Sequence, residues 1–245
     1  MHIVYHIFFL LIFVVQPISG YYSYKKYLKG LAEGKKPNRV KLYNQTMLMQ
    51  WCAFLVLVFT WFILDRSFSE LGFKSSNSNE LIIGVAVLAI SVTYLLYSLH
   101  VVRKMTSDEK VQQLDTLGDL IHVLPQNNRD FKYFVAISIT AGIVEEIIYR
   151  GFVFSYLAEF MPMWSVILVS SAAFGLGHAY QGIGGVIKVM VMGLVFGTYY
   201  VFTGSIWLPI IAHAVFDILQ GSMLLELAQT DEIKTPSIDN SKASE

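Results

Sequence analysis

Ionisable side chains that could do acid–base chemistry lie inside apolar stretches of this sequence. They form three groups, which are Glu145 and Glu146 with Arg150, then His178, and then His213 with Asp217. A charged side chain in the middle of a bilayer costs at least ~2.5–3.5 kcal/mol on insertion scales, so such residues normally face a bundle interior and mark function. Carboxylates and imidazoles held together can activate a water molecule for attack at a carbonyl carbon.

The two adjacent glutamates have different expected partners, because successive residues of a helix point about 100° apart. Glu146 precedes Arg150 by four residues, which is the favourable order for an ion pair on one helix face. Glu145 shares its face with Gly142 and Tyr149 and has no partner on its own helix. We therefore expect Glu145 to be the general base. For this helix taken alone, a purely structural salt-bridge network between helices is the alternative.

Each of the two histidine groups is ambiguous when it is considered alone. His178 lies among glycines at the end of an apolar stretch, where a lone histidine is more often a hydrogen-bonded core residue than a catalyst. His213 and Asp217 are four residues apart, so Asp217 can hold the imidazole in one tautomer. The pair could instead bind a metal ion such as zinc, or form a simple hydrogen bond between helices. The convergence of three such groups favours a shared function.

Other designs of membrane hydrolase do not fit this sequence. Ser170 and Ser171 lie in an apolar stretch and lack the glycine-flanked loop of a nucleophilic serine. Asp217 has no second aspartate within the apolar stretches, and no His-Glu-x-x-His motif occurs. The hydrolase design that remains is centred on a glutamate.

The elements that carry these residues should be membrane-spanning helices. The chain has 245 residues, of which 55% are hydrophobic and 15% are charged, and this composition is too apolar for an ordinary soluble domain. The formal net charge is zero, which gives no indication of a nucleic-acid partner, and the single Cys52 excludes an internal disulfide. The expected fold is an all-α polytopic bundle of about seven spans. These spans are Ile3–Ile18, Thr46–Leu64, Leu81–Val102, Tyr133–Leu157, Trp164–Tyr180, Val186–Phe202 and Ile206–Ala228.

The distribution of charge along the sequence predicts which loops are cytoplasmic, and it divides the chain into three segments. Basic residues follow the first span rather than precede it, which favours a retained span over a cleaved signal peptide and keeps this basic loop in the cytoplasm. Residues 1–105 are then N-terminal transmembrane helices with a basic cytoplasmic loop. Residues 106–228 hold an amphipathic linker helix, Thr106–Leu124, and the catalytic bundle. Residues 229–245 are a polar tail that we expect to be disordered.

The three groups, in this order, resemble the motifs of the CPBP (Abi) family of intramembrane proteases. That family includes CAAX prenyl endopeptidases and bacteriocin-processing or immunity proteins. The matching motifs are Glu145-Glu146-x-x-x-Arg150, Phe174-x-x-x-His178 and His213-x-x-x-Asp217, and the resemblance covers about Val111–Gln220.

The resemblance implies a role for each residue of the motifs. Glu145 would act with His178 to activate water, and Glu146 with Arg150 would support the site. His213 and Asp217 would stabilise an oxyanion or bind a metal, so Glu145, His178, His213 and Asp217 are also the possible metal ligands. Family members have Asn or Asp at the last position. An ionised Asp217 only accepts hydrogen bonds, which favours orientation of His213 or cation binding.

The expected function is endopeptidase activity on a membrane-associated peptide or protein substrate, in the plasma membrane of a prokaryote. A non-enzymatic immunity or scaffold protein that binds a membrane peptide is the alternative. An ion-coupled transporter is less favoured, because the sequence has no evident internal repeat.

Overall fold

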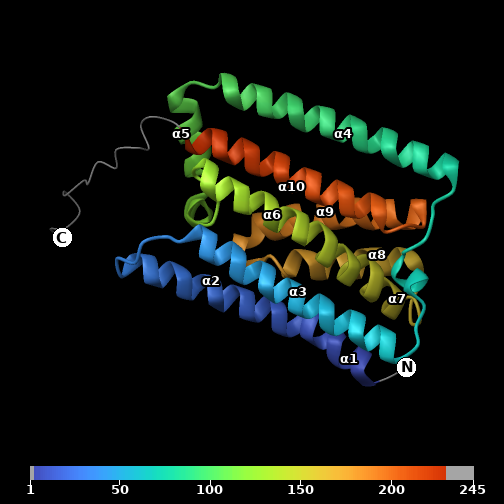
Figure 1. Cartoon of the computed structure of the whole chain (residues 1–245). Coiled ribbons are helices and arrows are strands. Elements are labelled where there is room, and N and C mark those ends of the chain that lie inside the picture. The colour runs from blue at the N-terminus through green and yellow to red at the C-terminus, as the bar shows by residue number, and fades with distance from the viewer. Residues whose placement is uncertain (1–2, 230–245) are drawn as a thin grey trace.

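The structure is a computed structural model that describes residues 3–229 as helices joined by short connections (Figure 1). The predicted polar tail lies outside the described residues, apart from Gln229. In chain order the elements are α1 (Ile3–Leu10), η1 (Leu11–Val15), α2 (Gln16–Ala32), α3 (Arg39–Ile63), η2 (Phe68–Leu71), α4 (Ser78–Lys104), α5 (Ser107–Asp115), η3 (Gly118–His122), α6 (Asn128–Glu146), η4 (Ile147–Val153), α7 (Phe154–Leu157), α8 (Met163–Leu176), η5 (Ala179–Gln181), α9 (Gly182–Thr203) and α10 (Trp207–Ala228).

The predicted all-α membrane bundle is confirmed. Five helices in the described part of the chain are long and apolar enough to cross a membrane: Ile3–Ala32, Arg39–Ile63, Ser78–Lys104, Ala179–Thr203 and Trp207–Ala228. The shorter apolar helix α8 and the helix formed by α6, η4 and α7 bring the bundle to the expected size of about seven spans. The long helices run lengthwise beside one another in Figure 1.

Two ends of the bundle can be distinguished. The connection from α2 to α3, the short helix α5 and the start of α6 lie at one end, and the first described residues and α7 lie at the other (Figure 1). The connection from α2 to α3 and the helix α5 therefore share one end, as the predicted topology requires. The predicted end of the first span at Ile18 is wrong, because the helix continues to Ala32 and includes the first part of the predicted basic loop.

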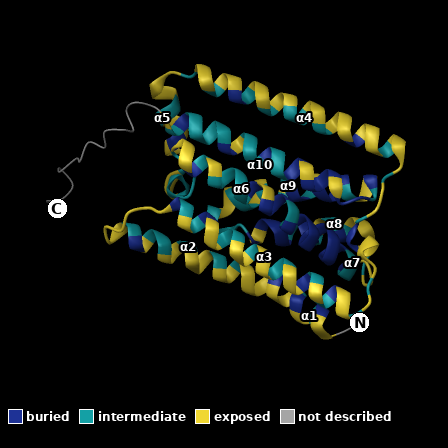
Figure 2. Ribbon diagram, in the orientation of Figure 1, coloured by how far each residue is buried: buried dark blue, intermediate teal, exposed yellow. Residues whose placement is uncertain are grey.

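Burial is concentrated around the helices that carry the candidate residues. Figure 2 shows buried residues gathered along η4, α7 and α8, whereas α4 is mostly exposed. Ile82 and Ile90 on α4 are 66% and 70% exposed, which suits a helix face in contact with lipid tails. The interior is thus built around the segment that follows Glu146.

The predicted linker helix Thr106–Leu124 is wrong in its length, because α5 ends at Asp115. Gly118 adopts a left-handed backbone conformation with φ of 52° and begins a separate 3-10 turn, η3. Helix α5 begins with a capping box in which the Thr106 backbone N–H donates to the Glu109 carboxylate. This hydrogen bond lowers the pKa of Glu109 below its ordinary value.

Helices α6 and α10 approach each other closely at Gly142. A Cβ atom added there would lie 2.9 Å from the Ala214 Cβ and 2.9 Å from the Ile210 carbonyl oxygen. We expect Gly142→Ala to destabilise the fold by about 1–3 kcal/mol, because the two backbones would have to separate. The measurement is the thermal unfolding midpoint in detergent micelles. The matched control is Gly184→Ala in α9, where an added Cβ meets nothing within 4 Å. Equal midpoints for both variants would contradict the close packing.

Candidate active site

The candidate residues come from helices that pack directly on one another. Glu145 and Glu146 are the last residues of α6, which contacts α10, the helix that carries His213 and Asp217. Directly after Glu146 the chain forms the π-helical turn η4, which holds Arg150. Such turns are rare within helices and are frequent at functional sites.

A buried ion-paired network joins three of these helices. Glu146 and Arg150 are both 0% exposed. Arg150 Nη1 donates to Glu146 Oε1 at 2.7 Å, and Arg150 Nη2 donates to the Gly193 carbonyl of α9 at 3.0 Å. His213 Nδ1 lies 2.7 Å from the same Glu146 Oε1. The ion pair predicted from the spacing of Glu146 and Arg150 is therefore confirmed, and it extends to His213.

Two aromatic rings enclose this network. The Arg150 guanidinium lies over the rings of Phe174 and Phe196, at 4.7 and 5.5 Å from their centroids. The imidazole of His213 stacks on Phe196, with centroids 5.0 Å apart and planes 17° apart. Cation–π contacts of this kind are strongest where water is excluded. Together these ring contacts fix the positions of the Arg150 and His213 side chains.

The hydrogen bond that orients His213 is accepted by Glu146 rather than by Asp217. The sequence left Asp217 either to orient the imidazole or to bind a cation; its Oδ2 lies 3.6 Å from His213 Nε2, whereas Glu146 Oε1 lies 2.7 Å from Nδ1. An ionised carboxylate only accepts, so Nδ1 carries the proton in this contact. The Nε2 atom then points towards Asp217 and towards Glu145, whose Oε2 is 3.9 Å away.

Glu145 is the accessible carboxylate of the pair, since 17% of its side chain is exposed. Its Oε1 accepts a hydrogen bond from Gln50 Nε2 on α3 at 2.7 Å. Sequence analysis did not identify Gln50, although an amide within an apolar span was a usable signal. Because Gln50 belongs to residues 1–105, the predicted N-terminal segment contributes to the site. The proposed division of the chain into segments stays a prediction.

His178 lies outside the helix in which it was expected. The predicted span Trp164–Tyr180 is too long, because α8 ends at Leu176 and His178 follows in a non-helical conformation with φ of −107°. Glycines at 175 and 177 weaken the helix at this point. The His178 Nδ1 lies 2.9 Å from the Phe174 carbonyl oxygen, which leaves Nε2 available for other partners.

The Phe174 ring contacts both imidazoles, with its centroid 5.1 Å from that of His178 and 5.7 Å from that of His213. Within residues 3–229 no hydrogen bond or ion pair joins His178 to Glu145, so their joint action on water stays a prediction. A second residue missed by the sequence analysis, Tyr180, lies beside His178, with the two ring centroids 6.0 Å apart. The three motifs thus meet in one cluster, with His178 at its edge.

The first helix also reaches this cluster. The Tyr149 hydroxyl donates to Gln16 Oε1 of α2 at 3.2 Å, and Tyr149 interacts electrostatically with Glu145. A Cβ atom added at Gly177 would lie 3.2 Å from both the Gln16 Oε1 and the Tyr149 hydroxyl. Glycine is therefore the residue that lets the chain pass between α2 and η4 just before His178.

A metal centre needs three or more donor side chains close together. In the described part of the chain, no three His, Cys, Asp or Glu side chains gather in a way that could hold a metal ion. Since His213 Nδ1 is engaged by Glu146, that ring offers only Nε2 to a ligand. The mechanism proposed for this site therefore takes no step through a metal. Metal binding by Glu145, His178, His213 and Asp217 stays a prediction.

Known proteins resemble this chain over the segment that holds most of this cluster. Residues 127–219 match the family described as Type II CAAX prenyl endopeptidase Rce1-like. A Bacillus subtilis (strain 168) protein named "Putative membrane peptidase YdiL" is 36% identical over 89 residues, which are 36% of this chain and 36% of that protein. The match thus spans about a third of the relative. No solved structure matches the chain significantly. The resemblance to the CPBP (Abi) family is confirmed over this segment.

Proposed function

We propose that this integral membrane protein, whose residues 127–219 match the Rce1-like family, is an intramembrane endopeptidase that uses water activated by Glu145. The observation that carries the proposal is the position of Glu145. Its carboxylate is partly accessible, accepts a hydrogen bond from Gln50 and faces His213 Nε2 within an apolar bundle. A carboxylate in such a setting can act as a general base.

The residues around Glu145 have distinct roles in the proposed reaction. Glu145 takes a proton from water as the water oxygen attacks the peptide carbonyl, and it then gives that proton to the leaving nitrogen. The available nitrogen of His178 helps to hold the water. His213 Nε2, with Asp217 beside it, faces the region where the oxyanion would form, and in the imidazolium form, with Nδ1–H held by Glu146, it donates to that oxyanion. Donors fixed before the reaction stabilise an oxyanion strongly where water is excluded.

Glu146 and Arg150 position this machinery and do not touch the substrate. Both are fully buried, and Glu146 holds His213 through Nδ1. The polar partners of Arg150 are Glu146 and the Gly193 carbonyl, so its role is to balance the charge of Glu146. This assignment gives the two adjacent glutamates separate roles, one chemical and one structural.

The proposed substrate is a membrane-associated peptide or protein, of the CAAX type or a bacteriocin precursor, in the plasma membrane of a prokaryote. A protein that binds such a peptide without cleaving it is the alternative function. The two are separated by reconstituting the full chain in liposomes with membrane-anchored peptides that carry a prenylated or an unprenylated C-terminal segment. Mass spectrometry should detect new peptide termini. Peptides that are bound but remain intact would support the alternative.

Gln50 provides a quantitative test of the proposed site. We expect Gln50→Leu to lower kcat by about 10- to 100-fold, since a hydrogen bond to a charged group contributes about 1.5–3 kcal/mol. The kcat is measured with the liposome assay. The matched control is Gln112→Leu, an exposed glutamine of α5 that lies outside the site and has no side-chain hydrogen-bond partner in the described structure. Unchanged turnover in Gln50→Leu would contradict a role for Gln50 in positioning Glu145.

A further inference from the structure

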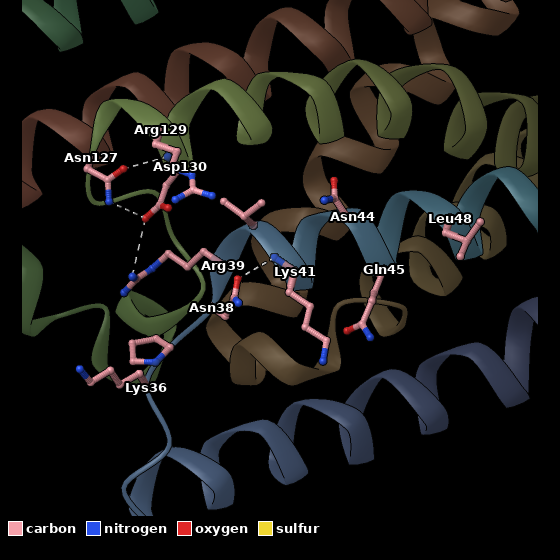
Figure 3. A pocket seen from close by; sticks show the side chains of 12 residues that line it. Lys36, Asn38, Arg39, Lys41, Asn44, Gln45, Leu48, Asn127, Arg129 and Asp130 are labelled. Carbon is pink, nitrogen blue, oxygen red and sulfur yellow. Dashed lines mark hydrogen bonds and ion pairs between the residues drawn. The ribbon is translucent and has the colours of Figure 1, made fainter.

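A cavity of about 710 Å³ lies between the starts of α3 and α6, away from the catalytic cluster (Figure 3). It is at the end of the bundle where the basic loop joins α2 to α3, which the charge distribution predicts to be cytoplasmic. Its lining residues are Lys36, Pro37, Asn38, Arg39, Val40, Lys41, Asn44, Gln45, Leu48, Asn127, Arg129 and Asp130. The proteolytic mechanism uses none of them.

The lining carries more positive than negative charge. Its cationic residues are Lys36, Arg39, Lys41 and Arg129, and its acidic residue is Asp130. The Asp130 carboxylate is already engaged, because Arg39 Nη1 lies 3.7 Å from Oδ2 and Asn127 Nδ2 donates to it at 3.0 Å. Lys36, Lys41 and Arg129 have no ion-pair partner among residues 3–229. The cavity therefore retains an excess of cationic groups.

Arg39 contributes a buried and partly unsatisfied donor to this cavity. Its side chain is only 9% exposed. Its Nη2 donates to the Ile121 carbonyl at a long 3.5 Å, and its Nε has no hydrogen-bond partner in the described structure. A buried guanidinium donor without a partner costs free energy, and an anion would satisfy it.

The starts of two helices add to the positive potential. Asn38 caps α3 by accepting from the Lys41 backbone N–H at 2.9 Å, and Asn127 caps α6 in the same way through Asp130 at 2.9 Å. Helix N-termini attract anions through their unpaired N–H groups and their dipole. Both caps line the cavity, so the two helix dipoles reinforce the cationic side chains.

Beyond the cationic residues, α3 presents an exposed apolar face that begins at the cavity. Leu48 lines the cavity and is 65% exposed, and further along α3 Leu55, Phe59 and Phe62 are 61%, 65% and 72% exposed. Spacings of seven, four and three residues place these side chains on one helix face. An anionic group in the cavity could thus be joined to a hydrocarbon chain that lies along this face. This combination is typical of a phospholipid rather than of a free anion.

We propose that this cavity binds the phosphate of an anionic phospholipid, with an acyl chain along the Leu48 face of α3. Basic pockets between transmembrane helices on the cytoplasmic side recognise anionic headgroups in this way. The phosphate would join α3 to α6 through Arg39 and Arg129. Gln50 lies eleven residues beyond Arg39 on α3, which is about 16 Å at 1.5 Å per residue. The bound lipid therefore stabilises the same helix pair that meets at Gln50 and Glu145.

The test is the thermal unfolding midpoint of the full chain in neutral detergent micelles, with phosphatidylglycerol, phosphatidylcholine or inorganic phosphate added. Phosphatidylglycerol near ten times its Kd should raise the midpoint by about 3–6 °C, and phosphatidylcholine should not. The cavity variant is Lys36→Gln with Arg129→Gln, which removes no hydrogen bond or ion pair between the described residues. The control is Lys26→Gln with Lys104→Gln, an equal change of charge at the same end but outside the cavity.

The control variant should keep the shift with phosphatidylglycerol, and the cavity variant should lose at least half of it. Equal shifts in both variants would show a general effect of surface charge and would overturn the proposal. An equal shift with inorganic phosphate would overturn the assignment to a lipid. None of these outcomes depends on the proteolytic activity.

Discussion

Glu145→Gln should abolish peptide hydrolysis, with kcat falling about 10³- to 10⁴-fold, while the protein stays folded. The loss is expected because glutamine cannot take a proton from water, and general-base catalysis contributes up to about 10⁴-fold. The fold should survive because the new side chain has the same shape. Its amide oxygen can still accept from Gln50 Nε2, which donates to Glu145 at 2.7 Å. The measurement is turnover in the liposome assay, together with the unfolding midpoint.

The comparison variant is Glu145→Asp, which keeps a carboxylate but draws it back by one methylene. It should retain more activity than Glu145→Gln, since a displaced base is better than none. Wild-type turnover in Glu145→Gln would rule out Glu145 as the base. If a biological phenotype survives in Glu145→Gln although hydrolysis is lost, the phenotype arises from peptide binding, as the immunity or scaffold alternative predicts.

Arg150→Met should have the largest effect on stability, a loss of about 3–5 kcal/mol in the free energy of unfolding. The substitution leaves Glu146 buried at 0% exposure without its ion-pair partner. It also removes the guanidinium that lies over Phe174 and Phe196. Denaturant unfolding in micelles provides the measurement. Substitution of Arg66 by Met is the matched control, because Arg66 pairs with Glu70 at the same i, i+4 spacing and also lies over aromatic rings, but its side chain is 29% exposed, and a solvent-screened pair contributes about 1 kcal/mol or less.

A second variant separates the effect of the uncompensated buried charge on stability from the effect of the lost packing. Adding Glu146→Gln to Arg150→Met removes the uncompensated carboxylate, so the double variant should recover part of the lost stability. If the double variant is less stable than Arg150→Met alone, Glu146 is not destabilised by the loss of its partner. That result would contradict the structural role assigned to the ion pair.

Local helical geometry accounts for much of what could be predicted. The apolar stretches gave the membrane bundle, because the length and hydropathy of a span are properties of a continuous segment. The ion pair of Glu146 and Arg150 followed from their spacing, since residues four apart on one helix meet regardless of the surrounding fold. The separation of Glu145 from Glu146 has the same origin.

Ends of helices were predicted less well, because weak helix formers leave several endings nearly equal in energy. Gly118 divides the expected linker helix into α5 and η3, and α8 ends at Leu176 before it reaches His178. In both places glycine allows the helix to end, but the local sequence does not determine that the helix ends there. Packing against the surrounding helices determines where each of these helices ends.

The sequence by itself determined the helical class of this protein, the number of its spans to within about one, the order of its motifs and the contacts within a single helix. Only the tertiary structure decided that His213 is held by Glu146 rather than by Asp217, and that Gln50 of α3 supports Glu145. Contacts within a helix are fixed by its 3.6-residue period. Contacts between helices depend on how their surfaces pack, on close approaches such as the one at Gly142, and on turns such as η4, and no local pattern encodes these.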